Sequence, residues 1–157
     1  MNWMILPFKR YAEFSGRSRR MEFWMFTLLN IIVAAVLAGP LYYDMFQTAM
    51  SDAMAGGAVD NAQLAESFSG ISMIMAGLYG IYALAAFIPS IAVTVRRLHD
   101  RNMSGWWYLG FIVASLIPLV GIIAAIAFLV IMFLDGTPGA NRFGPDPKGR
   151  GDVDTFA

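Results

Sequence analysis

Three long apolar segments follow one another along the chain. Residues 23–43, 70–95 and 106–134 contain no Asp, Glu, Lys, Arg or His. A helix needs about 20 apolar residues to cross a hydrocarbon core of about 30 Å. The pattern therefore predicts an all-α integral membrane protein with spans near these three ranges.

The third segment does not fit a simple crossing. As one helix, residues 106–134 would measure about 43 Å, whereas two full crossings would need about 40 residues. Pro118 lacks a backbone donor and disfavours a continuous helix. The segment either kinks as one span or folds into a short hairpin at Pro118 to Gly121, giving three or four transmembrane helices. We prefer the hairpin, because it returns the polar tail to the side of the other charged motifs.

Charges are distributed unevenly between the connections. Residues 1–22 contain five basic residues, the connection 44–66 contains only acidic charges, and Arg96, Arg97 and Arg101 follow the second span. The positive-inside rule therefore predicts a cytoplasmic N-terminus. We expect a cytoplasmic basic segment (1–22), a transmembrane domain (23–134) with an outer acidic loop (44–66), and a polar C-terminal tail (135–157) whose side the charges leave undetermined.

Composition narrows the class of protein. Hydrophobic residues make up 58% of the 157 residues and charged ones 14%, against about 25% charged in soluble domains. Eleven basic residues balance eleven acidic ones, which gives no indication of a nucleic-acid partner. The chain has no cysteine and one histidine, so we expect no metal site and no cofactor.

A basic turn precedes the first span. Arg17, Arg19, Arg20 and Glu22 lie within six residues of one another. Such a turn either anchors the helix at the interface or binds anionic headgroups, where each juxtamembrane arginine contributes about 1 kcal/mol.

A second polar motif follows the second span. If the helix continues, Arg96, His99 and Asp100 share one face, with Arg97 beside them. Asp100 then either orients His99, as in a general base, or bridges the arginines. A structural ion-pair network is the commoner reason for such a cluster.

The tail contains a third motif rich in turn residues. Its Asn141, Arg142 and Asp146 stand among prolines and glycines, which excludes a helix. The motif either docks against the basic motifs or is disordered.

Five motifs in order resemble a known bacterial family. They are residues 14–24 (FSGRSRRMEFW), 96–100 (RRLHD), 104–107 (SGWW), 117–121 (IPLVG) and 141–147 (NRFGPDP). Together they resemble the inner-membrane family catalogued as domain of unknown function 805. The resemblance implies a small multi-pass protein of the bacterial inner (plasma) membrane and no established activity.

These observations lead to three functional hypotheses. The first is a non-catalytic binding or scaffolding protein whose cytoplasm-facing basic site binds anionic lipid headgroups or a protein partner. The alternative is a small oligomeric transporter or channel. The third is a membrane enzyme that uses His99 and Asp100. The expected partners are the lipid bilayer, anionic lipids and further copies of the chain.

Overall fold

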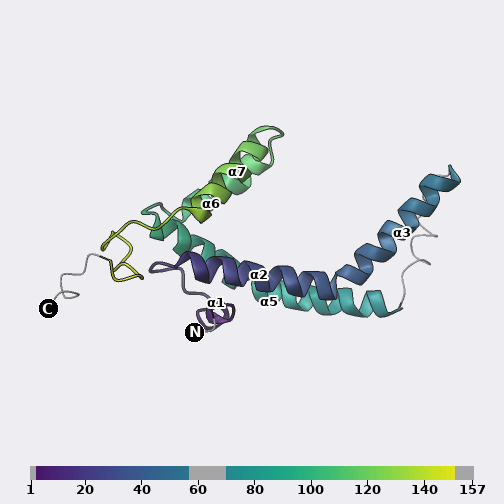
Figure 1. Cartoon of the computed structure of the whole chain (residues 1–157), viewed down its shortest axis with the longest axis horizontal. Coiled ribbons are helices and arrows are strands. Elements are labelled where there is room, and N and C mark those ends of the chain that lie inside the picture. Colours follow the sequence, from purple (N-terminus) through teal and green to yellow (C-terminus); the bar gives the residue numbers. More distant parts are fainter. Residues whose placement is uncertain (1–2, 57–69, 151–157) are drawn as a thin grey trace. The chain divides into compact units, whose positions relative to one another are not determined.

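The computed structural model describes residues 3–56 and 70–150, which form helices and no β-strand. The helices in chain order are α1 (Leu6–Lys9), α2 (Arg20–Leu37), α3 (Gly39–Ala55), α5 (Gly70–Asp100), α6 (Trp106–Ser115) and α7 (Val120–Phe133) (Figure 1). The predicted all-helical class is confirmed.

Within the described residues, two helices are long and apolar enough to cross a bilayer. They are α2, with 18 residues, and α5, with 31. In the most apolar window of each, only 17% and 11% of the residues are buried inside the protein. Apolar side chains exposed to this extent suit a lipid environment. The number of crossings made by the whole chain stays a prediction.

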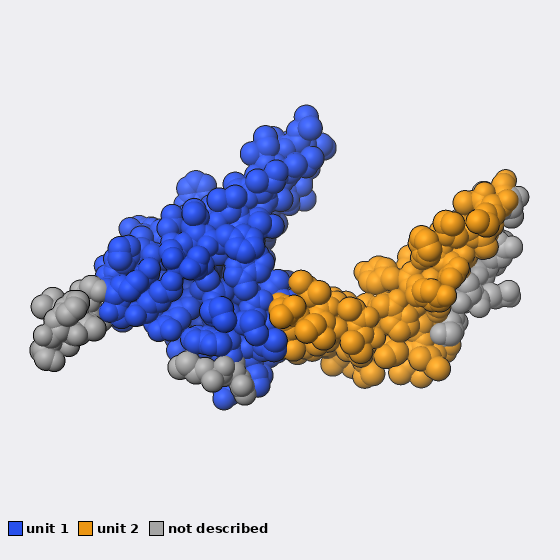
Figure 2. Space-filling view, viewed as in Figure 1, with its two compact units in different colours: residues 1–27, 87–157 blue, residues 28–86 orange. Residues whose placement is uncertain are grey.

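The chain forms two compact units, shown in Figure 2. Unit 1 comprises residues 1–27 and 87–157, and unit 2 comprises residues 28–86. In unit 2, the Tyr82 hydroxyl donates a hydrogen bond to Oδ1 of Asn30 at 3.1 Å. This bond joins α5 to α2 and satisfies two polar groups on apolar helices.

The segment expected to be one span over 23–43 is divided into two helices. The first, α2, ends at Leu37, and α3 starts at Gly39 with Pro40 in its first turn. Proline is accepted there because the first helical N–H groups have no intrahelical partner. The second helix continues to Ala55, so half of the expected acidic loop is helical, and the remainder of that loop lies outside the described residues.

In unit 1, the third apolar segment folds back on itself. Its two helices, α6 and α7, have 10 and 14 residues and lie side by side (Figure 1). At the turn, Leu119 has a φ of 64°, and a Cβ on Gly121 would lie 2.9 Å from the carbonyl oxygen of Ser115. The arms measure about 15 and 21 Å, each shorter than the bilayer core.

Candidate functional site

Three polar segments of unit 1 meet at the C-terminal end of α5. The N–H of Ser18 donates to the carbonyl of Arg96 at 3.1 Å, and the N–H of Thr137 donates to the carbonyl of Asp100 at 2.9 Å. These bonds join the segment before α2 and the tail to the same helix end. We call residues 16–22, 96–101 and 136–150 the polar junction.

Asp100 pairs with two arginines in the polar junction. Its Oδ1 accepts a hydrogen bond from Nε of Arg17 at 2.9 Å, and its Oδ2 accepts one from Nη1 of Arg97. All three side chains are at least 96% buried. Removing one member of such a group leaves an uncompensated buried charge. The sequence leaves two roles open for Asp100, orienting His99 or bridging the arginines. In the structure, Asp100 bridges Arg17 and Arg97.

The other donors of these arginines bind backbone carbonyls. Arg17 donates to the carbonyls of Gly139 and Thr137, both at 2.6 Å. Arg97 donates to the carbonyl of Leu134, just after α7. Guanidinium groups carry five N–H donors in a fixed fork, which allows one side chain to hold several acceptors. The two arginines therefore fix the start of the tail against α5.

A second buried ion pair joins α2 to α5. Nη2 of Arg96 lies 3.0 Å from Oε1 of Glu22, and both side chains are almost fully buried. The two atoms are close enough for an ion pair, but their geometry does not make a hydrogen bond. The attraction between them is therefore chiefly coulombic. Nη1 of Arg96 has no hydrogen-bond partner within the described part of the chain.

His99 is held by groups other than Asp100. Its Nδ1 lies 3.2 Å from the carbonyl oxygen of Gly16, and its ring stacks on Phe143 with centroids 3.9 Å apart and an interplanar angle of 3°. The carbonyl can only accept, so Nδ1 carries the proton in the neutral ring. The carboxylate that would orient a catalytic histidine is therefore bound to arginines, and a His99–Asp100 dyad is not formed.

The tail residues predicted from the sequence all take part in the docking. Asn141 donates to the carbonyl of His99 at 2.9 Å, and Arg142 donates to the carbonyl of Asn102 at 3.0 Å. Asp146 contacts the segment before α2, because Nη2 of Arg17 lies 3.9 Å from its Oδ1. Within the tail, Asp146 accepts hydrogen bonds from the N–H of Lys148 and from Nε of Arg150, both at 2.9 Å.

The environment of Asp146 shifts its acidity. Burial raises the pKa of its carboxyl, but the N–H of Lys148 and the guanidinium groups of Arg150 and Arg17 outweigh that effect and hold the pKa below its ordinary value. The docked tail therefore favours the ionised form.

Arg19 and Arg20 point to a different place. They line a cavity of about 380 Å³ together with five further residues, Trp3, Met21, Trp24, Phe133 and Lys148. We call it the basic cavity. Arg20 and Lys148 share the carboxylate of Asp135, while Arg19 donates to the carbonyl of Pro147 at 2.6 Å and lies over the ring of Trp3.

Sequence reasoning missed four members of this cavity and its rim as site residues: Trp3, Phe133, Asp135 and Lys148. Each lies outside the motifs that carried the sequence hypotheses. The available signal was the presence of charged and aromatic residues close to the predicted ends of apolar segments, which is typical of interfacial positions.

The described residues contain no group of three His, Cys, Asp or Glu side chains placed to hold a metal ion. The buried carboxylates of Glu22 and Asp100 instead face arginines. The chemistry of the polar junction is that of ion pairing.

Comparison with known proteins agrees with the membrane character of the helices. The family model described as protein of unknown function (DUF805) matches residues 11–145. Inner membrane protein YhaH of Escherichia coli (strain K12) is 40% identical over 148 residues, which cover 94% of this chain and 98% of YhaH. Inner membrane protein YhaI of the same strain is 34% identical over 148 residues, covering 94% and 97%. No solved structure matches the chain. The resemblance of the five motifs is thereby confirmed, and the chain belongs to the DUF805 family, whose relatives YhaH and YhaI are inner membrane proteins.

Proposed function

We propose that this chain is a non-catalytic binding protein of the bacterial inner membrane that holds an anionic phospholipid headgroup in the basic cavity. The N-terminus, the polar junction and the tail lie on the cytoplasmic side in this proposal. The positive-inside rule supports that orientation, because the arginines gather in segments 1–22 and 96–101.

The observation that carries the proposal is the division of the arginines into two groups. Arg17 and Arg97 are buried against Asp100, and Arg96 is buried against Glu22. These three are occupied inside the protein. The other two arginines of the basic turn, Arg19 and Arg20, line the basic cavity together with Lys148.

The basic cavity has the charge and the shape that a headgroup needs. Three cations, Arg19, Arg20 and Lys148, surround it, and Asp135 at its rim supplies one negative charge, which leaves two positive charges. Arg20 is also the first residue of α2, where the helix dipole favours anions. Lipid phosphates bind such clusters by charge-assisted hydrogen bonds.

The aromatic side chains support a position of the cavity at a membrane surface. Trp24 stacks on Phe133 with ring centroids 4.2 Å apart, and Trp3 lies beside Arg19. Tryptophan rings prefer the headgroup level of a bilayer. From there α2 continues into its apolar residues, so a lipid in the cavity would have its chains beside the helix.

The test is lipid retention by the full-length protein. Native mass spectrometry after release from phosphatidylcholine nanodiscs containing phosphatidylglycerol should show retained phosphatidylglycerol. Lys148→Gln should lower retention about fivefold, because one cation contributes about 1 kcal/mol. The matched control is Lys9→Gln, which removes an exposed charge outside the cavity and should leave retention unchanged.

A second variant separates lipid binding from a structural role of the same cations. Asp135→Asn frees Arg20 and Lys148 for a ligand, so retention should rise. If the cations only fix the tail, Asp135→Asn and Lys148→Gln should have the same effect, and the proposal fails. Solute flux through proteoliposomes would favour the transporter alternative, and recovery of a stoichiometric protein partner in place of lipid would favour a protein-binding site.

A further inference from the structure

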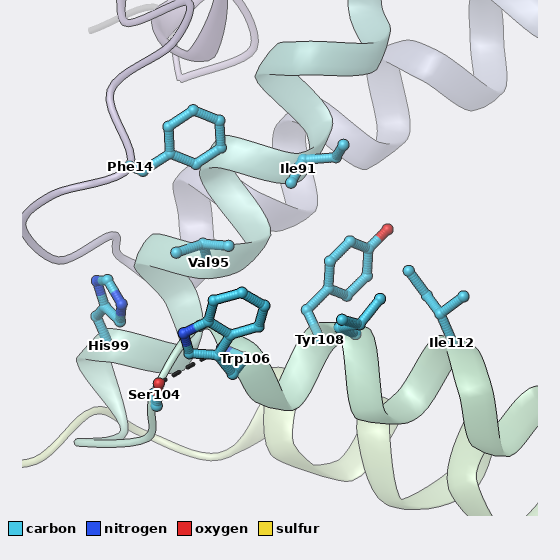
Figure 3. Close-up of a pocket in the computed structure, with 10 residues that line it drawn as sticks. Phe14, Ile91, Val95, His99, Ser104, Trp106, Tyr108 and Ile112 are labelled. Carbon is cyan, nitrogen blue, oxygen red and sulfur yellow. Dashed lines mark hydrogen bonds between the residues drawn. The ribbon is translucent and has the colours of Figure 1, made fainter.

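A second cavity lies between the end of α5 and the start of α6, and its chemistry differs from that of the basic cavity. It has a volume of about 560 Å³, within the range of small-molecule pockets. Figure 3 shows residues that line it. Its wall is mostly apolar, and most of the lining side chains are aromatic or aliphatic ones from the segment before α2, from α5 and from α6, among them Phe14, Val95, Trp106, Tyr108, Leu109 and Ile112.

One imidazole nitrogen at this cavity has no hydrogen-bond partner among residues 3–56 and 70–150. His99 lines the cavity, and its Nδ1–H is used by the carbonyl of Gly16. In the neutral ring Nε2 then has a lone pair and no proton. No residue in the described ranges bonds to Nε2. A Cβ built on Gly105, which also lines the cavity, would lie 3.5 Å from Nε2 of His99.

A hydrogen-bond donor lies at the same cavity. Ser104 also lines it, and its Oγ accepts from the N–H of Trp106 at 3.4 Å (Figure 3). Because a hydroxyl both accepts and donates, the O–H hydrogen of Ser104 is available to a ligand. The cavity therefore offers one acceptor and one donor beside an apolar wall.

We propose that this cavity binds a lipophilic alcohol, whose hydroxyl donates to Nε2 of His99 and accepts from the hydroxyl of Ser104. A hydroxyl can both donate to an imidazole nitrogen and accept from another hydroxyl. A carboxylate has no proton for Nε2, and an ammonium group has no lone pair for Ser104.

The apolar portion of such a ligand would lie along the wall toward α6. Leu109 and Ile112 are exposed on that helix, so a chain leaving the cavity would meet further apolar surface. This cavity is separate from the basic cavity, and its ligand class differs from an anionic headgroup. Binding of the alcohol here and binding of the headgroup there do not depend on each other.

The single histidine of the chain makes a direct test possible. Full-length protein with ¹⁵N-labelled histidine is placed in phosphatidylcholine nanodiscs at pH 8, where an imidazole of ordinary pKa is neutral. The spectrum should show a protonated Nδ1 and an unprotonated Nε2. Titration with 1-dodecanol should move the Nε2 resonance saturably in the direction of hydrogen-bond acceptance, whereas dodecane should not move it.

A second set of titrations distinguishes two classes of ligand that carry a hydroxyl. An aliphatic alcohol models a glycerolipid hydroxyl, and 4-octylphenol models a quinol. A saturable shift of Nε2 with either compound supports the proposal, and the lower half-saturation identifies the source. No shift with both compounds, an equal shift with dodecane, or a protonated Nε2 in the starting protein overturns it.

Two variants test the recognition of the alcohol, and the Nδ1 resonance reports whether the local fold is intact in each. Ser104→Ala removes one hydrogen bond and should raise the half-saturation about fivefold, while Ile112→Trp should fill the cavity and abolish the shift. In both variants an unchanged Nδ1 resonance reports that the contact of His99 with Gly16 is intact. An unchanged half-saturation in Ser104→Ala would overturn the two-point recognition of the hydroxyl.

Discussion

Nε of Arg17 lies 2.9 Å from Oδ1 of Asp100, although 83 positions separate the two residues in the chain. The same carboxylate binds Arg97, and Arg17 continues to the carbonyls of Thr137 and Gly139. This one ion pair therefore joins the segment before α2, the end of α5 and the tail.

Asp100→Asn should destabilise the protein by about 3–5 kcal/mol, because two buried arginines lose their counter-charge. The measurement is the free energy of unfolding in mixed micelles titrated with sodium dodecyl sulfate. The matched control is Glu13→Gln, which removes a half-exposed pair with Arg10 and should cost less than about 1 kcal/mol. Equal losses in the two variants would contradict a buried network.

Gly136→Ala should detach the tail. An ideal Cβ on Gly136 would overlap the carboxylate of Asp100, so the backbone has to move away from α5. Trypsin should then cut after Arg142 several-fold faster than in the unsubstituted protein. Gly110→Ala is the control, because a Cβ there meets nothing within 4 Å, and its cleavage rate should not change.

The tail should lie on the same side of the membrane as the end of α5. Thr137 is hydrogen-bonded to Asp100, and a bilayer cannot separate two residues in contact. In this cysteine-free chain, Ala140→Cys and Ser104→Cys should both react with a membrane-impermeant maleimide from the cytoplasm, and Met54→Cys from the periplasm. Labelling of Ala140→Cys from the periplasm alone would show that the third apolar segment crosses completely.

Docking of the tail should weaken in acid. The pKa of Asp146 in the folded protein is lower than its ordinary value of 3.8, so its contribution is fully present above that value and is lost as the pH falls through the folded pKa. Fluorescence anisotropy of a dye on Ala140→Cys should decrease as the pH is lowered through this range. Asp146→Asn should reduce the pH-dependent part, and an unaltered transition would assign it to another carboxylate.

Leu119→Gly should stabilise the hairpin by about 1 kcal/mol. Leu119 has a φ of 64° and a ψ of −50°, and the N–H of Val120 donates to the carbonyl of Pro118. This γ-turn with positive φ is strained for a non-glycine residue by about 1–3 kcal/mol. The comparison is Leu116→Gly, which removes a similarly exposed leucine at a φ of −75° and should destabilise by up to about 1 kcal/mol. Unfolding free energies from the same micelle titration distinguish the two, and destabilisation by both would contradict strain at Leu119.

The local pattern and spacing of residues were sufficient to predict several features of the candidate site. Arg96, His99 and Asp100 share one helix face because α5 continues to Asp100, as the i, i+3, i+4 spacing requires. That face meets α2 through Glu22, and it meets the segment before α2 through Gly16 and Arg17. The sequence could not choose between His99 and Arg17 as the partner of Asp100, since that choice depends on which residues approach from distant parts of the chain.

The three apolar runs, read alone, predicted the helical class, the presence of long apolar helices and a break near Pro118, because lipid exposure and proline geometry act on local sequence. They did not predict that the first run is divided between α2 and α3. Only the tertiary structure decided that the third run folds back, that the tail docks, and that Arg17, Arg96 and Arg97 are buried while Arg19 and Arg20 line the basic cavity. These outcomes depend on burial and on ion pairs between residues far apart in the chain, and the strength of such pairs follows from their surroundings rather than from the motif that contains them.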